Sequence, residues 1–191
     1  MVKYAIFHEG KDSKEAANNN LIRFLIKHLN LNVEKVQFYP MSSKTNFFKL
    51  DCLRYKELLQ DIKIEEISKA FFVLDADSKR SDAKYGGYEN TQRELSTILD
   101  NLGISEISDT YISCNPVTQT GYLESLILST IPDEQRACIE QFLECSEFKS
   151  KDNAKVILNQ IYKQAYPNAP YDFSHENFNE LKEKLTALFS E

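Results

Sequence analysis

Two aspartates directly follow a run of apolar residues in the middle of the chain. Residues 71–74 (Phe-Phe-Val-Leu) are typical of a buried strand, and Asp75 and Asp77 come immediately after it. Residues i and i+2 of an extended chain lie on the same side, so we expect both carboxylates to project together from the end of the strand. Carboxylate oxygens are the ligands that Mg²⁺ prefers in proteins. Because acid-x-acid pairs arise by chance among 29 acidic residues, the strand context is what points to a metal site.

A third acid follows another apolar stretch. Residues 2–7 are predicted to form a strand that is followed by Glu9, Gly10 and Lys11. A glycine directly after a strand allows the backbone to approach a ligand closely. Glu9 is therefore a candidate metal ligand or general base, and Lys11 a candidate for neutralising a phosphate. The alternative is a tight turn that carries surface charges.

Further charged candidates follow later in the chain. Glu124 stands at the start of a predicted helix, where it is a possible additional metal ligand, although a carboxylate there also compensates the helix dipole. The loop at 78–88 carries Lys79, Arg80 and Lys84, which could bind a phosphodiester substrate beside an acidic metal site. The alternative for each of these basic residues is a place on a solvated loop.

Strands and helices alternate over the first two-thirds of the chain. The apolar patterns predict strands at 2–7, 33–39, 70–74 and 110–114. They predict helices between these strands at 13–29, 47–62 and 90–102. Such an alternation indicates an α/β fold with a four-stranded, mostly parallel sheet covered by helices on both faces. The acids after strands one and three share a site only if these strands are neighbours, which predicts the strand order 2-1-3-4.

The remainder of the chain carries helical patterns only. Helices are predicted at 121–130, 132–145, 152–165 and 174–189. We therefore expect an α/β domain at 1–130 and a helical appendage at 131–191 that packs on it.

Composition limits the class of protein. With 191 residues and 42% hydrophobic residues, the chain can bury its own core, and no stretch is apolar enough to span a membrane. Four scattered cysteines without a Cys-x-x-Cys motif favour reduced thiols and a cytoplasmic location. The net charge of −6 disfavours a general nucleic-acid coat protein, but it allows an enzyme that meets nucleic acid through a metal and a local basic patch. Phosphate-binding P-loop, dinucleotide-binding and nucleophile-elbow motifs are absent from the sequence.

Three short motifs together resemble those of a known family. Glu-Gly-Lys at 9–11, Leu-Asp-Ala-Asp at 74–77 and Gly-x-Leu-Glu at 121–124 look like the motifs of the TOPRIM domain. This catalytic domain is shared by topoisomerases, bacterial primases and overcoming-lysogenization-defect (OLD) nucleases. The resemblance covers about residues 1–130 and is greatest to small stand-alone TOPRIM-like proteins related to the OLD branch. It implies a Rossmann-like TOPRIM fold.

The same resemblance implies roles for the acids. Glu9, Asp75 and Asp77 would hold Mg²⁺ or Mn²⁺ and serve phosphodiester cleavage or transfer on DNA or RNA, with Glu124 as an additional ligand. His8 stands where an aliphatic residue commonly precedes the glutamate of the family. Nothing in the chain resembles the ATPase half of OLD proteins, the tyrosine-bearing domains of topoisomerases or the zinc module of primases. The expected activity is therefore that of a nuclease.

Two other functions fit parts of the pattern. A catalytically silent TOPRIM-like module would keep the acids for metal binding or regulation and act on a protein partner. A phosphoacceptor receiver domain also collects acids after strands one and three, but it usually has two acids directly after strand one and a lysine after strand five. The chain offers one acid after strand one and no fifth strand pattern, so the receiver domain fits less well.

Overall fold

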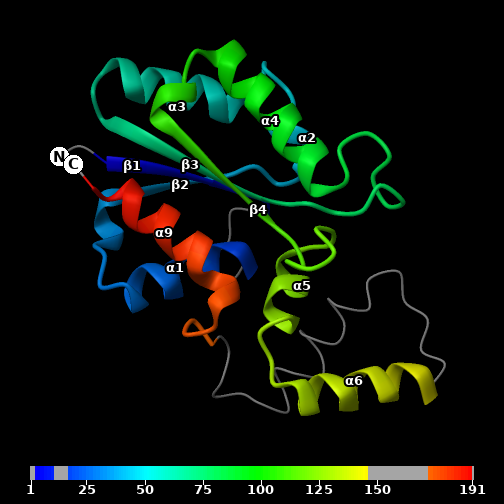
Figure 1. Cartoon of the computed structure of the whole chain (residues 1–191). Coiled ribbons are helices and arrows are strands. Elements are labelled where there is room, and N and C mark those ends of the chain that lie inside the picture. Colours follow the sequence, from blue (N-terminus) through cyan, green and yellow to red (C-terminus); the bar gives the residue numbers. More distant parts are fainter. Residues whose placement is uncertain (1–2, 11–16, 146–171, 191) are drawn as a thin grey trace.

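Four parallel strands form the centre of the molecule. The computed structural model describes residues 3–10, 17–145 and 172–190 (Figure 1). The strands are β1 (Lys3–His8), β2 (Val36–Pro40), β3 (Ile67–Asp75) and β4 (Ser108–Ser113). Their order in the sheet is β2-β1-β3-β4, and every neighbouring pair is parallel. The predicted α/β class and the predicted strand order are confirmed.

Helices cover both faces of the sheet (Figure 1). The α-helices are α1 (Ala17–His28), α2 (Lys44–Phe47), α3 (Leu53–Lys63), α4 (Tyr88–Leu102), α5 (Leu123–Leu128), α6 (Asp133–Cys145) and α9 (Asn179–Leu188). Short 3₁₀ turns are η1 (Val33–Lys35), η2 (Ser105–Ile107) and η4 (Glu176–Phe178). One core contains side chains of α1, α5 and α9, and a second core contains side chains of α2, α3 and α4. Within the described residues, none of the helices has the length and apolar character that crossing a membrane requires.

The two central strands supply side chains to both cores. Ile6 and Phe71 belong to the core beneath α1 and α9, whereas Phe7 and Phe72 belong to the core beneath α3 and α4. Successive side chains of a strand point to opposite faces, so a strand covered on both sides is apolar throughout. The rings of Phe7 and Phe72 stack with their centroids 4.6 Å apart. This continuous burial explains the uninterrupted apolar run that precedes Asp75.

The C-terminal helix α9 is part of this layered structure. Leu181 and Leu185 of α9 are fully buried in the same core as the inner face of α1. Lys184 of α9 also forms an ion pair with Asp109 of β4, with Nζ 2.8 Å from Oδ1. Of the predicted appendage at 131–191, the structure describes residues 131–145, which include α6, and residues 172–190. The helix predicted at 152–165 lies outside the described residues.

The region between β2 and β3 differs from the prediction. The single helix predicted at 47–62 is two helices, α2 and α3, separated by residues 48–52. Leu53, which the predicted helix included, is the first residue of α3 and is 66% exposed. Helix α2 instead starts early, at Lys44, and the side chain of that lysine is buried, with 7% of it exposed. The break therefore bears directly on the candidate site.

Candidate functional site

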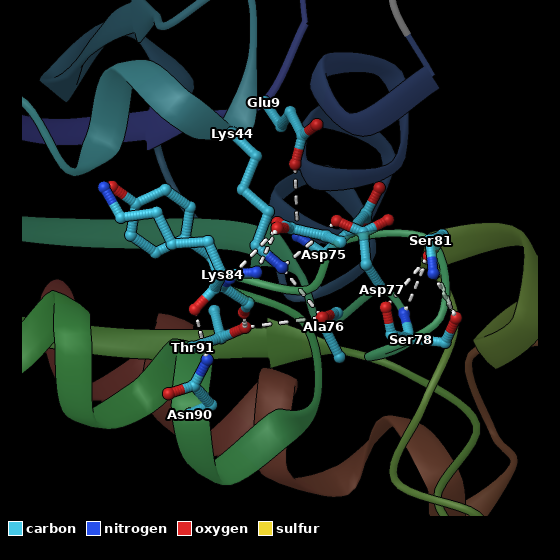
Figure 2. A network of polar contacts seen from close by, with 12 residues as sticks. Glu9, Lys44, Asp75, Ala76, Asp77, Ser78, Ser81, Lys84, Asn90 and Thr91 are labelled. Atoms are coloured by element: carbon cyan, nitrogen blue, oxygen red, sulfur yellow. Dashed lines mark hydrogen bonds and ion pairs between the residues drawn. The ribbon is translucent and has the colours of Figure 1, made fainter.

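Glu9 and Asp75 meet at the carboxyl edge of the sheet. Residue His8 at the end of β1 pairs with Val73 of β3, which brings the segments after both strands side by side. The Asp75 N–H donates a hydrogen bond of 3.4 Å to Glu9 Oε2 (Figure 2). The Glu9 N–H donates one of 3.3 Å to the Val73 carbonyl. The structure thus brings together two of the acids predicted from the sequence. They come from neighbouring strands, as the parallel sheet requires.

Asp75 also holds the start of α5. The residue is 6% exposed, and its Oδ1 accepts a 2.9 Å hydrogen bond from the Leu123 N–H. The first N–H groups of a helix have no partner within the helix, so an external carboxylate satisfies one of them. Glu124, the next residue of α5, is itself 6% exposed. Asp75 therefore links the end of β3 to the first turn of the helix that carries Glu124.

Asp77 has a different environment from Asp75. β3 ends at Asp75, and Asp77 adopts a left-handed conformation with φ of 57°. Its N–H donates to the Gly121 carbonyl at 2.7 Å, and the Gly121 N–H donates back to the Asp77 carbonyl at 3.0 Å. The extended geometry assumed for residues 75–77 was therefore wrong. At Asp77 the chain has left the strand, and its backbone pairs with the segment that precedes α5.

The carboxylate of Asp77 forms an ion pair with Lys44. The two groups are 3.1 Å apart, between Nζ and Oδ2, and Nζ also donates a 2.7 Å hydrogen bond to the Ala76 carbonyl (Figure 2). A buried ammonium requires such partners, because burying an isolated charge is costly. Sequence reasoning missed Lys44. A lysine that stands 33 positions before Asp77 carries no local signal that it will reach this acid.

The carbonyl of Ala76 connects the acids to α4. Besides Lys44, it accepts a 2.9 Å hydrogen bond from the Gly87 N–H and lies 3.3 Å from Thr91 Oγ1. Thr91 is fully buried, and its hydroxyl also donates to the Tyr85 carbonyl at 2.6 Å. These contacts tie the loop at 78–87 and the first turn of α4 to the peptide that lies between Asp75 and Asp77.

The predicted basic residues lie on the surface of this loop. Lys79, Arg80 and Lys84 are all exposed. Lys79 and Lys84 line a common pocket at the start of α4, of which Arg80 is not a lining residue. The remaining basic candidate, Lys11, lies outside the described residues.

The acids do not form a ready-made metal centre. Within residues 3–10, 17–145 and 172–190, no group of three or more His, Cys, Asp or Glu side chains is arranged to hold a metal ion. Lys44 supplies the positive charge beside Asp77, and Asp75 Oδ1 is engaged with the Leu123 N–H. A divalent cation that bound both aspartates would need these contacts to rearrange.

Thiol chemistry does not suit this edge of the sheet. Cys114 follows β4 and is 8% exposed. Burial, together with the negative charges of Glu180 and Asp75, raises the pKa of its thiol to about 11. The reactive thiolate of Cys114 is therefore scarce at neutral pH.

Comparisons with known proteins gave no relative. No protein-family model matches the chain, and the comparisons with curated proteins and with solved structures found no match. The resemblance to TOPRIM domains rests on the three motifs at 9–11, 74–77 and 121–124.

Proposed function

We propose that the chain is a TOPRIM-type nuclease that uses Mg²⁺ or Mn²⁺ to cleave or transfer phosphodiester bonds in nucleic acid. One observation supports this proposal above the others: Glu9 and Asp75 approach each other from neighbouring parallel strands, with the Asp75 N–H 3.4 Å from Glu9 Oε2. Ligands of open parallel sheets bind at the carboxyl ends of the strands, and this is the edge where these acids lie. Asp77 and Glu124 are the further acids of the proposed site.

Lys44 and a divalent cation compete for Asp77 in this proposal. Both are cations, and the carboxylate cannot bind a metal through the oxygen that Lys44 contacts without releasing the ammonium. The lysine side chain is flexible, so release requires no movement of the sheet. We therefore expect weak metal binding by the unmodified chain and tighter binding when Lys44 loses its charge.

A cleavage assay tests the proposed nuclease activity. Supercoiled plasmid, single-stranded DNA and RNA are incubated with the full chain in Mg²⁺, Mn²⁺ or EDTA. Asp75→Asn is the decisive variant, because the amide keeps an oxygen to accept the Leu123 N–H but removes the negative charge. We expect loss of metal-dependent cleavage with an unchanged circular dichroism spectrum. Asp51→Asn, which makes the same change at an exposed position before α3, is the matched control.

Two results would count against a nuclease. The proposal is wrong if Asp75→Asn cleaves as fast as the unmodified chain, or if no substrate is cleaved with either metal.

A catalytically silent TOPRIM-like module is the second candidate. The ion pair between Lys44 and Asp77 favours it, because the position beside Asp77 already holds a positive charge. This alternative predicts that the unmodified chain neither cleaves nucleic acid nor binds Mg²⁺, whereas Lys44→Met binds Mg²⁺. Isothermal titration of both proteins with MgCl₂, read together with the cleavage assay, separates the two functions.

A further inference from the structure

A pocket opens beside the start of α4, separate from the acids but connected to them. Its volume is about 610 Å³. The loop at 78–87, the segment at 118–119 and the first turns of α4 supply the lining residues. A volume of this size lies within the range of sites for small-molecule ligands and cofactors.

The charge of this pocket is opposite to that of the protein. Lys79, Lys84 and Arg93 line it, against a single carboxylate from Glu89, although the whole chain has a net charge of −6. Neither lysine forms an ion pair with any carboxylate of the described residues. Arg93 contacts Glu94 at 3.2 Å, in an exposed pair of the kind that contributes little. Lys84 Nζ also lies 4.6 Å from the centre of the Tyr85 ring, and Arg93 donates a hydrogen bond to Asn90 Oδ1. Because all three cations are exposed, an external anion can still reach them.

Backbone contacts place this pocket next to the acids. Gly87, a lining residue, donates its N–H to the Ala76 carbonyl between Asp75 and Asp77. The Tyr88 N–H donates to the Gln119 carbonyl at 3.3 Å, which joins the two sides of the pocket. An anion held here lies beside the carboxyl edge of the sheet.

Gly87 brings one of the lysines close to the backbone. Its φ of 91° is a conformation that side-chain-bearing residues rarely adopt. A Cβ built at this position would lie 3.6 Å from Cε of Lys79. The stem of Lys79 therefore lies beside Gly87, although the residue is exposed.

We propose that this pocket binds the phosphate of one phosphorylated nucleotide, supplied as a free nucleotide or as the end of a strand. Three cations match one or two phosphate groups, whereas proteins that bind duplex DNA contact about 6–10 phosphates. Tyr88, half-buried in the lining, adds an aromatic side chain of the type on which bases stack. The nucleotide nature of the ligand rests on the proposed function, whereas the binding of phosphate rests on the pocket alone.

Binding measurements without metal test this site independently of cleavage. The full chain carrying Asp75→Asn is titrated in EDTA with AMP, with adenosine and with inorganic phosphate, by calorimetry or by NMR shifts. We expect AMP to bind at least tenfold more tightly than adenosine. The double variant Lys79→Gln/Arg93→Gln should weaken AMP binding at least tenfold. Arg136→Gln, which removes one charge from α6 far along the chain from the pocket residues, should leave it unchanged.

Oligothymidylates with and without a terminal phosphate show whether the bound phosphate belongs to a free nucleotide or to the end of a strand. Tighter binding of the phosphorylated strand than of AMP assigns the pocket to a strand end, and the reverse assigns it to a free nucleotide. The proposal is overturned if AMP and adenosine bind equally, or if the double variant keeps the affinity for AMP. These titrations are done without metal and with the Asp75→Asn variant. Their outcome is therefore independent of whether the chain cleaves nucleic acid.

Discussion

The acids at the sheet edge and the lysines of the basic pocket at α4 differ in whether the fold itself supplies their partners. Asp75 and Asp77 are bound by groups of the protein itself, the Leu123 N–H and the Lys44 ammonium. Lys79 and Lys84 lie less than ten residues further along the chain, are exposed, and have no ion-pair partner among the described residues. Both aspartates therefore have partners within the fold, whereas the two lysines have no ion-pair partner among the described residues.

This difference separates structural from ligand-binding contributions. Charges that are buried must be paired within the fold, so their removal lowers the stability of the folded state. Exposed charges on a loop contribute little to stability, so a cluster of one sign points to a partner outside the chain. The acids are therefore expected to serve both stability and chemistry, and the basic pocket to serve binding.

The largest effect on stability is expected from Lys44→Met. This change leaves Asp77, whose side chain is 19% exposed, without its ion-pair partner and removes a donor to the Ala76 carbonyl. Breaking a buried pair costs about 3–5 kcal/mol, and the partial exposure of Asp77 places the loss near the lower end, about 3 kcal/mol. Urea unfolding of Lys44→Met and of the unmodified chain measures this loss of stability. Adding Asp77→Asn should restore part of the lost stability, and a loss below about 0.5 kcal/mol for the single variant would contradict the assigned ion pair.

A smaller loss is expected from Asp75→Ala. The change leaves the Leu123 N–H at the start of α5 without its acceptor, at a cost of about 1–3 kcal/mol. Asp75→Asn keeps an acceptor and should lose less. Thermal unfolding of the two variants provides the comparison, and equal losses would show that the hydrogen bond does not hold α5.

Cys114 reports the charge of Asp75 through its own pKa. Burial raises the pKa of this thiol to about 11, and Glu180 and then Asp75 contribute in the same direction. A nearby negative charge disfavours the thiolate, so Asp75→Asn and Glu180→Gln should each lower the pKa, the latter by at least as much. Thiolate absorbance against pH, in a chain whose other three cysteines are serine, measures the shift. An increase of the Cys114 pKa in either variant would contradict the placement of these two carboxylates near the thiol.

The smallest effect on stability is expected in the basic pocket. Lys79→Gln and Lys84→Gln should each change the free energy of unfolding by less than about 0.5 kcal/mol, because both side chains are exposed and no ion pair with a described residue is lost. Urea unfolding beside Lys44→Met gives the direct contrast. A loss above about 1 kcal/mol in either variant would show that the pocket is structural.

Much of the fold was predictable because the local patterns agree with one another. The apolar runs before Glu9 and Asp75 read as strands buried on both faces, and acids after strands one and three meet only if these strands are neighbours. The observed order β2-β1-β3-β4 follows. The break at 48–52 was not predictable, since the leucine spacing at 50 and 53 fits one continuous helix, and both side chains are exposed in the fold.

Part of the candidate site escaped sequence reasoning for a similar reason. Lys44 and Arg93 belong to no recognisable motif, and the first of them lies in a segment predicted to precede a helix rather than to begin one. Asp77 was expected to lie in extended chain and to project to the same side as Asp75, but its backbone pairs with Gly121, 44 positions later. Contacts between distant residues have no counterpart in local spacing.

By itself, the sequence determined the alternation of strands and helices, the parallel sheet and the edge at which Glu9 and Asp75 lie. These features follow from the periodicity of apolar residues and from the direction of parallel strands, both of which are local or general rules. The tertiary structure alone decided the partner of each charge: Leu123 for Asp75, Lys44 for Asp77, and none within the described residues for Lys79. Burial sets these partnerships, because a buried charge must be matched by whichever group the fold brings beside it.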